Sequence, residues 1–313
     1  MANDEHNSAS GSINTVVVNG LEIANTLRDE MAEEIKALVA DGRRPPSLVV
    51  VLIGDDPASR SYIKGKQRAC SRIGMDSREL VFPETTSESD LLDVIKELNA
   101  DNGVDGILVQ LPLPKQIDPY VVAEALDPAK DVDALHPNTA GKLLSGRADL
   151  ISCTPLGVMA VLDRCGVETE GAHAVVIGRS DIVGKPVSIL LQQANATVTL
   201  CHSRTRDLAS ICRQADILVA ATGRPRMVKA DWIKPGAAVM DVGVTEVDGK
   251  LVGDVDFEAA QGIAAYITPS RRGIGPMTIT MLLRNTLVAY TKRTKRTKHT
   301  KDTKDTKHTE HSA

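Results

Sequence analysis

The chain has 313 residues, about twice the ~150 residues of an average domain, so its length predicts two domains. Hydrophobic residues make up 42% and charged residues 25% of the chain, and no run approaches the ~18 apolar residues that a membrane span needs. The composition therefore excludes a membrane-inserted protein.

The formal net charge of −4 combines an acidic body with a basic tail. Residues 291–313 carry eight Lys or Arg and three Asp or Glu, whereas residues 1–290 carry 29 and 38. A chain with an acidic body and 2% aromatic residues lacks the cationic surface and the stacking side chains that nucleic-acid binding uses. No nucleic-acid partner and no membrane partner are expected.

The first residues and the cysteines predict the compartment. Residues 1–14 are polar, carry no apolar or Arg-rich targeting pattern, and are expected to be disordered. The five cysteines form no C-x-x-C pair and show no zinc-like spacing. Reduced thiols, no metal site and a cytoplasmic location follow from these patterns.

Helical and strand-like patterns alternate through the first half of the chain. Apolar residues recur at helical spacing in some segments, and others are continuous apolar runs typical of buried strands. The predicted helices are 21–40, 57–73 and 89–99, and the predicted strands are 47–54, 79–82 and 106–114. This βαβ rhythm predicts a parallel sheet covered by helices.

The rhythm restarts after Ile151. The predicted helices are 154–165, 184–194 and 276–290, and the predicted strands are 174–178, 197–203, 215–223 and 237–244. No Gly-, Pro- or Ser-rich linker separates the two series. We therefore expect two packed domains that share a cleft.

The tail consists of seven triplets that each begin with Thr, at 291–311. A period of three matches neither a helix nor a strand, and the segment has no apolar residue to bury, so disorder is predicted. Two alternatives stay open for the tail. Its Lys and Arg residues could contact an anion, and His299, His308 and His311 could bind a metal adventitiously.

The segment AVVIGRSDIVGKP, at 174–186, has the pattern of a phosphate-binding turn. A buried strand ends on Gly178, and a helix starts near Gly184. Glycines at such a turn let backbone amides approach a phosphate, and the helix N-terminus favours its negative charge. The alternative is an ordinary tight turn between a strand and a helix.

The end of the following strand favours NADP over NAD. NAD-binding sheets place a carboxylate there to hold the ribose hydroxyls, but residues 201–206 read CHSRTR. Arg179 lies in the phosphate turn itself, and a guanidinium group pairs well with phosphate. The alternative is that these arginines are solvated surface residues.

Tyr62 and Lys66 lie four residues apart on a predicted helix and so share one face. A lysine that exchanges protons near neutral pH needs its pKa lowered by burial or by a cationic neighbour. Surface decoration is the alternative for such a pair.

Two more segments place polar groups where open α/β folds bind ligands. Gln110 interrupts an apolar strand end directly before the rigid sequence LPLP, and Asp131 and Asp133 lie in a loop rich in Pro, Asn and Gly. A turn that ends the strand and Asx-turn chemistry are the alternatives.

These segments occur in one order with related ones: SYIKGKQRACSRIGM, GILVQLPLP, KDVDALHPNTAGKL, GRSDIVGKPVSILL and GPMTITMLLRNT. The order closely resembles the bifunctional methylenetetrahydrofolate dehydrogenase/methenyltetrahydrofolate cyclohydrolase family over about residues 15–290. The resemblance implies a catalytic, folate-binding α/β domain at 15–150, to which helix 276–290 returns. It also implies a Rossmann-like NADP-binding domain at 151–275 and a homodimer.

The resemblance implies two reactions of one-carbon metabolism. NADP⁺ oxidises 5,10-methylenetetrahydrofolate to the methenyl form, and water converts this to 10-formyltetrahydrofolate. Lys66 is then the general acid/base, Tyr62 lies beside the pterin, Gln110 orients Lys66, and Asp133 binds the pterin amino edge. The implied NADP contacts are Gly178, Arg179, Ser180, Ile182, Val183, Gly184, Ser203, Thr222, Gly223 and Val244. The implied substrate contacts are Tyr62, Gln110, Leu111, Pro112, Asp133, Pro269 and Gly273.

One loop departs from the family pattern. Residues 268–278 read TPSRRGIGPMT, with Arg271 and Arg272 where the family has a proline and a glycine. Because this loop lies against nicotinamide and folate in the family, an alternative is a folate- or nucleotide-binding protein with weakened dehydrogenase chemistry. Another NADP-dependent dehydrogenase of the shikimate type is a third reading, but it leaves the first-half motifs unexplained.

Overall fold

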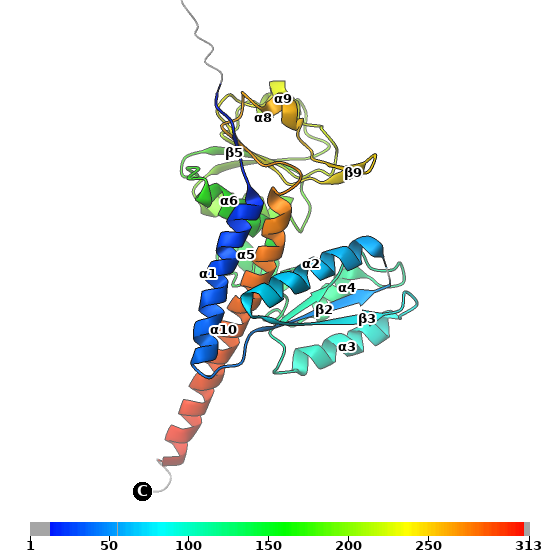
Figure 1. Ribbon diagram of the computed structural model, residues 1–313, viewed down its shortest axis with the longest axis vertical. Coiled ribbons are helices and arrows are strands. Elements are labelled where there is room, and N and C mark those ends of the chain that lie inside the picture. Colours follow the sequence, from blue (N-terminus) through cyan, green and yellow to red (C-terminus); the bar gives the residue numbers. More distant parts are fainter. Residues whose placement is uncertain (1–12, 55, 310–313) are drawn as a thin grey trace, which may run out of the picture.

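The computed structural model describes residues 13–54 and 56–309, with the side chains of 57–59, 61–62 and 296–309 left out. It has two α/β units connected by long helices (Figure 1). No helix among the described residues is long and apolar enough to cross a membrane. All five cysteines are free thiols, as the sequence predicts.

The first unit contains a parallel sheet of three strands in the order β3-β2-β4. The strands are β2 (Ser47–Ile53), β3 (Asp76–Phe82) and β4 (Gly106–Val109), and the helices are α2 (Pro57–Ile73), α3 (Glu88–Ala100), α4 (Pro119–Ala125) and α5 (Pro137–Leu144). The central strand β2 is buried along nearly its whole length, which explains its continuous apolar sequence. The parallel order and the strands predicted at 47–54 and 79–82 are confirmed to within a few residues. The strand predicted at 106–114 ends at Val109, because the prolines that follow have no N–H group to pair with a neighbouring strand.

The second unit contains a parallel sheet of six strands in the order β1-β11-β8-β7-β5-β6. Its strands are β1 (Val16–Val17), β5 (His173–Ile177), β6 (Thr197–Cys201), β7 (Ile217–Ala220), β8 (Ala238–Asp241) and β11 (Tyr266–Ile267). Its helices are α6 (Cys153–Arg164), α7 (Gly184–Gln193), α8 (Leu208–Cys212) and α9 (Phe257–Ala260), with a 3₁₀ turn at Ala230–Trp232. The two-unit α/β fold predicted from the sequence is confirmed.

Two features of the second unit were not predicted. The antiparallel hairpin of β9 (Thr245–Val247) and β10 (Lys250–Val252) turns at Asp248 and Gly249, both with positive φ. The short strand β1 pairs with β11, so the described chain starts in the second sheet although residues from 15 on were expected in the first domain. A strand of two residues is too short to show an alternating pattern of apolar residues, so the sequence did not predict β1.

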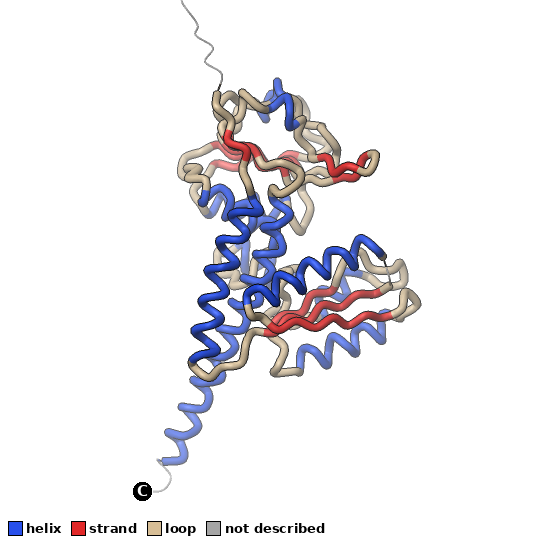
Figure 2. Tube along the Cα trace, in the orientation of Figure 1, coloured by secondary structure: helices blue, strands red, loops and turns tan. Residues whose placement is uncertain are grey.

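Helices α1 (Gly20–Ala40) and α10 (Ile274–Thr309) run side by side and connect the two units (Figures 1 and 2). The last helix returns to the first unit as expected. Its Asn285 donates to the carbonyls of Val132 and Ile151, both at 2.8 Å. Gly106 is required where α10 passes β4, because a Cβ atom there would collide with Val132 and press on Thr286.

The sequence predicted a disordered tail from residue 291, whereas α10 continues as a helix to Thr309. The first triplets find acceptors for their side chains. The hydroxyls of Thr291 and Thr294 donate to the carbonyls four residues earlier, and Lys292 pairs with Asp149. The side chains of His299, His308 and His311, considered for metal binding, lie outside the described part of the chain.

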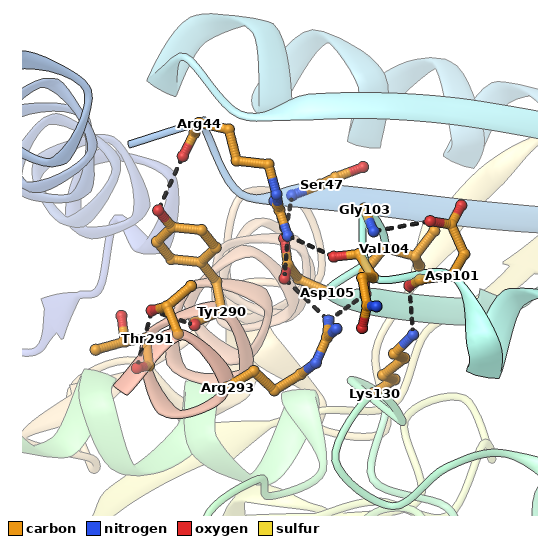
Figure 3. A network of polar contacts seen from close by, with 12 residues as sticks. Arg44, Ser47, Asp101, Gly103, Val104, Asp105, Lys130, Tyr290, Thr291 and Arg293 are labelled. Carbon is orange, nitrogen blue, oxygen red and sulfur yellow. Dashed lines mark hydrogen bonds and ion pairs between the residues drawn. The ribbon is translucent and has the colours of Figure 1, made fainter. Parts of the chain in front are cut away.

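A buried carboxylate holds α10 against the first sheet at Arg293 (Figure 3). Asp105 is fully buried and accepts two hydrogen bonds from Arg44, at 2.6 and 2.9 Å, and one from Arg293 at 3.0 Å. The Tyr290 hydroxyl donates to the Arg44 carbonyl at 2.9 Å, and the Arg44 guanidinium lies 5.2 Å from the Tyr290 ring centroid. Charge and packing together anchor the helix.

The substitution Asp105→Ala is expected to destabilise the protein by roughly 2–3 kcal/mol, because it leaves two guanidinium groups without their shared carboxylate. The control Arg78→Ala breaks an exposed pair with Asp101, whose side chains are 52% and 43% exposed, and should cost less than ~1 kcal/mol. Urea unfolding of the three proteins measures both values. Equal losses in the two variants would show that Asp105 is not a structural anchor.

Candidate functional site

A cavity of about 470 Å³ lies between the two units. Residues from both units line it, including Lys66, Gln110, Leu111, Pro112, Val183 and Val244. The α2 helix supplies Lys66, the exit of β4 supplies residues 110–112, and the phosphate turn supplies Val183. The structure thus brings six of the sequence-predicted site residues together from segments far apart in the chain.

Lys66 and Gln110 are joined by a hydrogen bond in this cavity. The Lys66 Nζ donates to Gln110 Oε1 at 2.8 Å, and Gln110 Nε2 donates to the Leu111 carbonyl at 2.6 Å. The Gln110 backbone N–H donates to the Val51 carbonyl, which fixes the residue to the sheet. Because both ends of the Gln110 amide are held, its oxygen is fixed in position to receive the Lys66 ammonium group.

The surroundings of Lys66 lower its pKa. Burial is the main cause, because it disfavours the charged form, and the nearby Asp133 partly opposes it. Burial raises the pKa of Asp133 in turn, and Lys66 opposes that change. Each group thus favours the ionised form of the other in a site that favours neutral forms. This balance is typical of groups that exchange protons near neutral pH.

Asp133 faces a second, mostly apolar cavity of about 270 Å³ beside the first. Leu111 and Ile182 line it from the two units, and Asp131 lies in its wall. Asp131 accepts from the His136 N–H at 2.7 Å, but its Oδ1 has no hydrogen-bond partner among the described residues. Burial raises the pKa of Asp131 to about 7. A donor group on a ligand would satisfy carboxylates placed in this way.

Two more residues lie near Lys66 and Asp133. Tyr62 lies one turn before Lys66 on α2, but its side chain is outside the described part. Cys153 is buried next to Asp133, and burial and this carboxylate raise the pKa of its thiol well above the usual value. No role for Cys153 follows from the sequence, because the first residue of a helix in an apolar run gives no signal for one.

The predicted phosphate turn has the expected local form. A Cβ atom on Gly178 would collide with the Ala221 carbonyl, and one on Gly184 would collide with the Gly178 carbonyl. The Ser180 hydroxyl accepts from the N–H groups of Val183 and Gly184 at 3.2 and 3.3 Å. The turn therefore requires both glycines, and it ends at the N-terminus of α7, where an anion is favoured.

A cavity of about 540 Å³ opens beside this turn. Five predicted cofactor residues line it: Gly178, Arg179, Ser180, Ser203 and Thr222. Its described lining includes Arg179 and Arg224 but no carboxylate. The glycine turn, the hydroxyls and the guanidinium groups fit a dinucleotide with an additional phosphate. Among the described residues, no group of three His, Cys, Asp or Glu side chains could hold a metal ion.

Two buried carboxylates that were not predicted as site residues hold the backbone next to this cavity. Asp254 accepts from the N–H groups of Thr222 and Gly223 and from the Thr222 hydroxyl. Asp241 accepts from the N–H groups of Asp254 and Val255, at 2.9 and 3.0 Å. The two carboxylates fix the segments that follow β7 and β10. The available signal was a polar residue at the end of an apolar strand. Asp241 ends β8 in this way, and Gln110 follows β4 in the same way.

The loop before α10 contains the remaining predicted residues. Gly273 packs so closely on Pro269 that a Cβ atom would collide with the Pro269 carbonyl, and Gly20 of α1 packs equally closely on Gly273. The side chains of Arg271 and Arg272 are exposed, and Arg272 has a φ of 64°, a region that favours glycine. The backbone at Arg272 therefore keeps a conformation that favours glycine, although an arginine stands there.

The chain matches two family models that together cover most of its length. Residues 18–133 match the tetrahydrofolate dehydrogenase/cyclohydrolase catalytic domain, and residues 152–294 match the NAD(P)-binding domain of the same family. A relative from Halothermothrix orenii named bifunctional protein FolD is 54% identical over 275 residues, which are 87% of this chain and 97% of the relative. A protein of that name from Rhodopirellula baltica is 50% identical over 287 residues, 87% of this chain and 96% of the relative.

The chain also aligns with solved structures of methylenetetrahydrofolate dehydrogenase/cyclohydrolases. The bifunctional FolD methylenetetrahydrofolate dehydrogenase/cyclohydrolase from Campylobacter jejuni aligns with a TM-score of 0.87 and 41% identity, over 89% of this chain and 99% of that one. The Trypanosoma brucei dehydrogenase-cyclohydrolase, solved with NADP and an inhibitor, aligns with a TM-score of 0.85 and 38% identity. That alignment covers 90% of this chain and 98% of the other.

The substitution Arg272→Gly is expected to stabilise the protein by roughly 0.5 kcal/mol, because relief of the left-handed backbone conformation outweighs the extra freedom of glycine in the unfolded chain. Arg271→Gly is the matched control, because Arg271 lies next to it, is equally exposed and has no positive φ. That control should lose a few tenths of a kcal/mol. If urea unfolding shifts both variants in the same direction, the backbone at Arg272 is not strained.

Proposed function

The chain belongs to the tetrahydrofolate dehydrogenase/cyclohydrolase family, and from this we propose that it carries out both reactions of that family. It oxidises 5,10-methylenetetrahydrofolate with NADP⁺ and hydrolyses the resulting methenyl compound to 10-formyltetrahydrofolate. The observation that supports this best is the single cavity lined by Lys66 and Gln110 on one side and by Val183 and Val244 on the other. A folate bound there would meet both the proton-transfer pair and the cofactor.

Lys66 serves the hydrolysis. Water adds to the methenyl carbon and loses a proton, which leaves a hydroxyl group on that carbon. The hydroxyl then loses its proton to solvent as the formyl carbonyl forms and the bond to N5 breaks, and N5 takes up a proton. Burial favours the neutral amine of Lys66, which can accept the first proton, and the cationic methenyl substrate favours it further. The protonated form can then deliver a proton to the leaving nitrogen.

Gln110 and Asp133 position the reaction partners. The 2.8 Å bond to Gln110 Oε1 fixes the direction of the Lys66 Nζ. Asp133 lies in the adjoining cavity, where its carboxylate can accept hydrogen bonds from the amino edge of the pterin, and Asp131 offers an unpartnered oxygen in the same wall. The fixed pair and the carboxylates together hold the folate with its reactive carbon near Lys66.

The oxidation depends on the binding of the cofactor. When bound, NADP⁺ supplies the nicotinamide carbon that accepts the hydride, so no titrating side chain is needed for that step. Gly178 and Gly184 let the phosphate turn approach the diphosphate, and Asp254 holds Thr222 and Gly223 in place. Val183 and Val244 line the cavity next to Lys66, where a bound nicotinamide would meet the folate.

The cofactor is NADP in preference to NAD. Arg179 and Ser203 lie in the same cavity beyond the phosphate turn, and the described lining of that cavity has no carboxylate to bind a free ribose hydroxyl pair. A guanidinium group and a hydroxyl suit the 2′-phosphate. Asp181, the nearest carboxylate in the turn, is paired with Lys185.

We also propose a cytoplasmic homodimer joined through the cofactor-binding units. The edge strand β6 supports this, because it leaves one side of the sheet unpaired in the described chain and Leu200 is 38% exposed on it. Sedimentation at several protein concentrations gives the mass, and a monomer at all of them would exclude the dimer.

The substitution Lys66→Ala is expected to lower the rate of methenyltetrahydrofolate hydrolysis by at least ~10²-fold, as removal of a general acid/base does. The control Lys64→Ala removes an exposed lysine from the same helix and should leave the rate unchanged. The loss of methenyl absorbance measures both. Hydrolysis at the wild-type rate in Lys66→Ala would remove this residue from the mechanism.

The substitution Arg179→Ala is expected to raise the KM for NADP⁺ by about 10-fold or more and to change the KM for NAD⁺ little, because a charge-assisted bond to phosphate contributes ~1.5–3 kcal/mol. Lys250→Ala, which removes an exposed cation from strand β10 of the same unit, is the control. Steady-state oxidation of methylenetetrahydrofolate with each cofactor gives the values. Equal increases for both cofactors would rule out a 2′-phosphate contact.

A further inference from the structure

Two threonines from distant segments form a hydroxyl pair in the wall of the cavity between the two units. Thr154 lies in the first turn of α6 and Thr278 near the start of α10, and both line the 470 Å³ cavity that contains Lys66 and Gln110. Their Oγ1 atoms are 3.0 Å apart, and either one can donate to the other. We call these two residues the threonine pair.

Thr278 differs from the other α10 threonines whose side chains the structure describes. Those hydroxyls donate to the carbonyl four residues earlier, at 2.8 to 3.0 Å, in Thr280, Thr286, Thr291 and Thr294. A threonine inside a helix commonly makes this local bond. The Thr278 hydroxyl instead bonds to Thr154 and lines the cavity. It is therefore directed at the site and not back at its own helix.

Backbone packing on both sides holds the threonine pair in place. A Cβ atom on Gly157 of α6 would lie 2.9 Å from the Cβ atom of Met277, so the two helices touch directly beside Thr278. Asn285 of α10 donates to the carbonyl of Ile151, just before α6, at 2.8 Å. Because α6 and α10 are joined at both places, the two hydroxyls have a fixed position in the cavity wall.

The threonine pair has hydrogen-bonding capacity left for a ligand. Two hydroxyls together have two hydrogens and four lone pairs. Their mutual bond uses one hydrogen and one lone pair, and the described part of the chain offers the two hydroxyls no other hydrogen bond. The Gln110 amide, in contrast, is held at both ends, by Lys66 and by the Leu111 carbonyl. The pair thus suits a molecule that both donates and accepts, such as water.

The start of α6 also lies close to the general acid/base. Burial and Asp133 raise the pKa of the Cys153 thiol, and the charge of Lys66 is near enough to oppose them. Thr154 follows Cys153 directly and lines the same cavity as Lys66. A water molecule in this cavity would therefore have a proton acceptor at Lys66 and hydrogen-bond partners at the threonine pair.

We propose that the threonine pair holds the water molecule that attacks the methenyl carbon during hydrolysis. This assignment rests on the proposed function, which places that carbon near Lys66. Water attacks with one lone pair, so its two hydrogens need two acceptors. The neutral amine of Lys66 takes one of them as a proton. The threonine pair accepts a hydrogen bond from the other and so sets the direction of the attack.

The same pair serves the oxygen after the attack. As the carbon–oxygen bond forms, the π electrons of the carbon–nitrogen double bond move to nitrogen, which neutralises the methenyl cation. The hydroxyl on the carbon then loses its proton to solvent, and its O–H electrons form the formyl carbonyl. The electrons of the bond to N5 move to N5, which takes up a proton. Because either threonine can donate, the pair can turn its remaining hydrogen toward the formyl oxygen as negative charge develops there.

The test measures both activities of the full-length protein in Thr154→Val and Thr278→Val, which keep the shape of the side chain and remove the hydroxyl. The substrates are 5,10-methenyltetrahydrofolate for hydrolysis and 5,10-methylenetetrahydrofolate with NADP⁺ for oxidation. The ratio of the hydrolysis rate to the oxidation rate should fall by about 10-fold or more in each variant, because hydride transfer uses no water. The double variant should lose no more than the worse single variant, since the pair acts as a unit.

Two kinds of control separate the hydroxyls from the packing. Thr154→Ser and Thr278→Ser keep the hydroxyl and should restore the ratio to near its wild-type value. Thr294→Val removes a hydroxyl from the same helix outside the cavity and should change neither rate. In the valine variants the pH dependence of hydrolysis should keep its midpoint, because threonine does not titrate and Lys66 is unchanged.

Hydrolysis at the wild-type rate in either valine variant would overturn the assignment, so one folded variant is enough to decide it. An equal fall of both activities would also overturn it, because the pair would then be a structural link between α6 and α10. If the wild-type protein neither hydrolyses the methenyl compound nor reduces NADP⁺, the proposed function itself fails, which is a different result from an unchanged ratio.

Discussion

The packing of α1 against α10 is the constraint on which the rest of the structure depends. These two helices cross from one sheet to the other, and the cleft between the sheets contains the candidate site. At one end, Gly20 of α1 packs directly on Gly273 at the start of α10. Further along α10, Asp105 binds Arg293 of that helix and Arg44 of the segment that follows α1 (Figure 3). Because these contacts fix both units to the same pair of helices, they set the distance from Lys66 to the phosphate turn.

Buried charge has two different uses in this molecule. Asp105 is compensated by two guanidinium groups and anchors a helix. Lys66 and Asp133 are only partly compensated, so burial lowers the pKa of Lys66 and raises that of Asp133, which suits proton transfer. The degree of compensation within the chain therefore separates a structural site from a catalytic site.

The sequence predicted the parts of the fold whose signal is local. Continuous apolar runs identified the buried strands, and the glycines of 178–184 identified the turn, because a Cβ atom at either end would collide with a carbonyl. The pair of Lys66 and Gln110 was found from polar residues at a strand end and on one helix face. The pairing of strand β1 and the support of Thr222 by Asp254 depend on contacts between distant segments. No single stretch of sequence carries those contacts, and the ion pairs of Lys292 with Asp149 and of Arg293 with Asp105 likewise join the tail to residues far from it in the chain.

Two reactions in one cleft are tested most directly by a progress curve of the wild-type protein with 5,10-methylenetetrahydrofolate and either NADP⁺ or NAD⁺. The absorption bands of reduced cofactor and of the methenyl compound overlap, so full spectra are recorded through the reaction and resolved into the two components, which gives formation of the methenyl compound and its hydrolysis separately. The shared cleft predicts faster reduction of NADP⁺ than of NAD⁺, and methenyl absorbance that stays low because the compound is hydrolysed as it forms. Methenyl compound that accumulates without decay, or a cofactor that is not reduced, would contradict it.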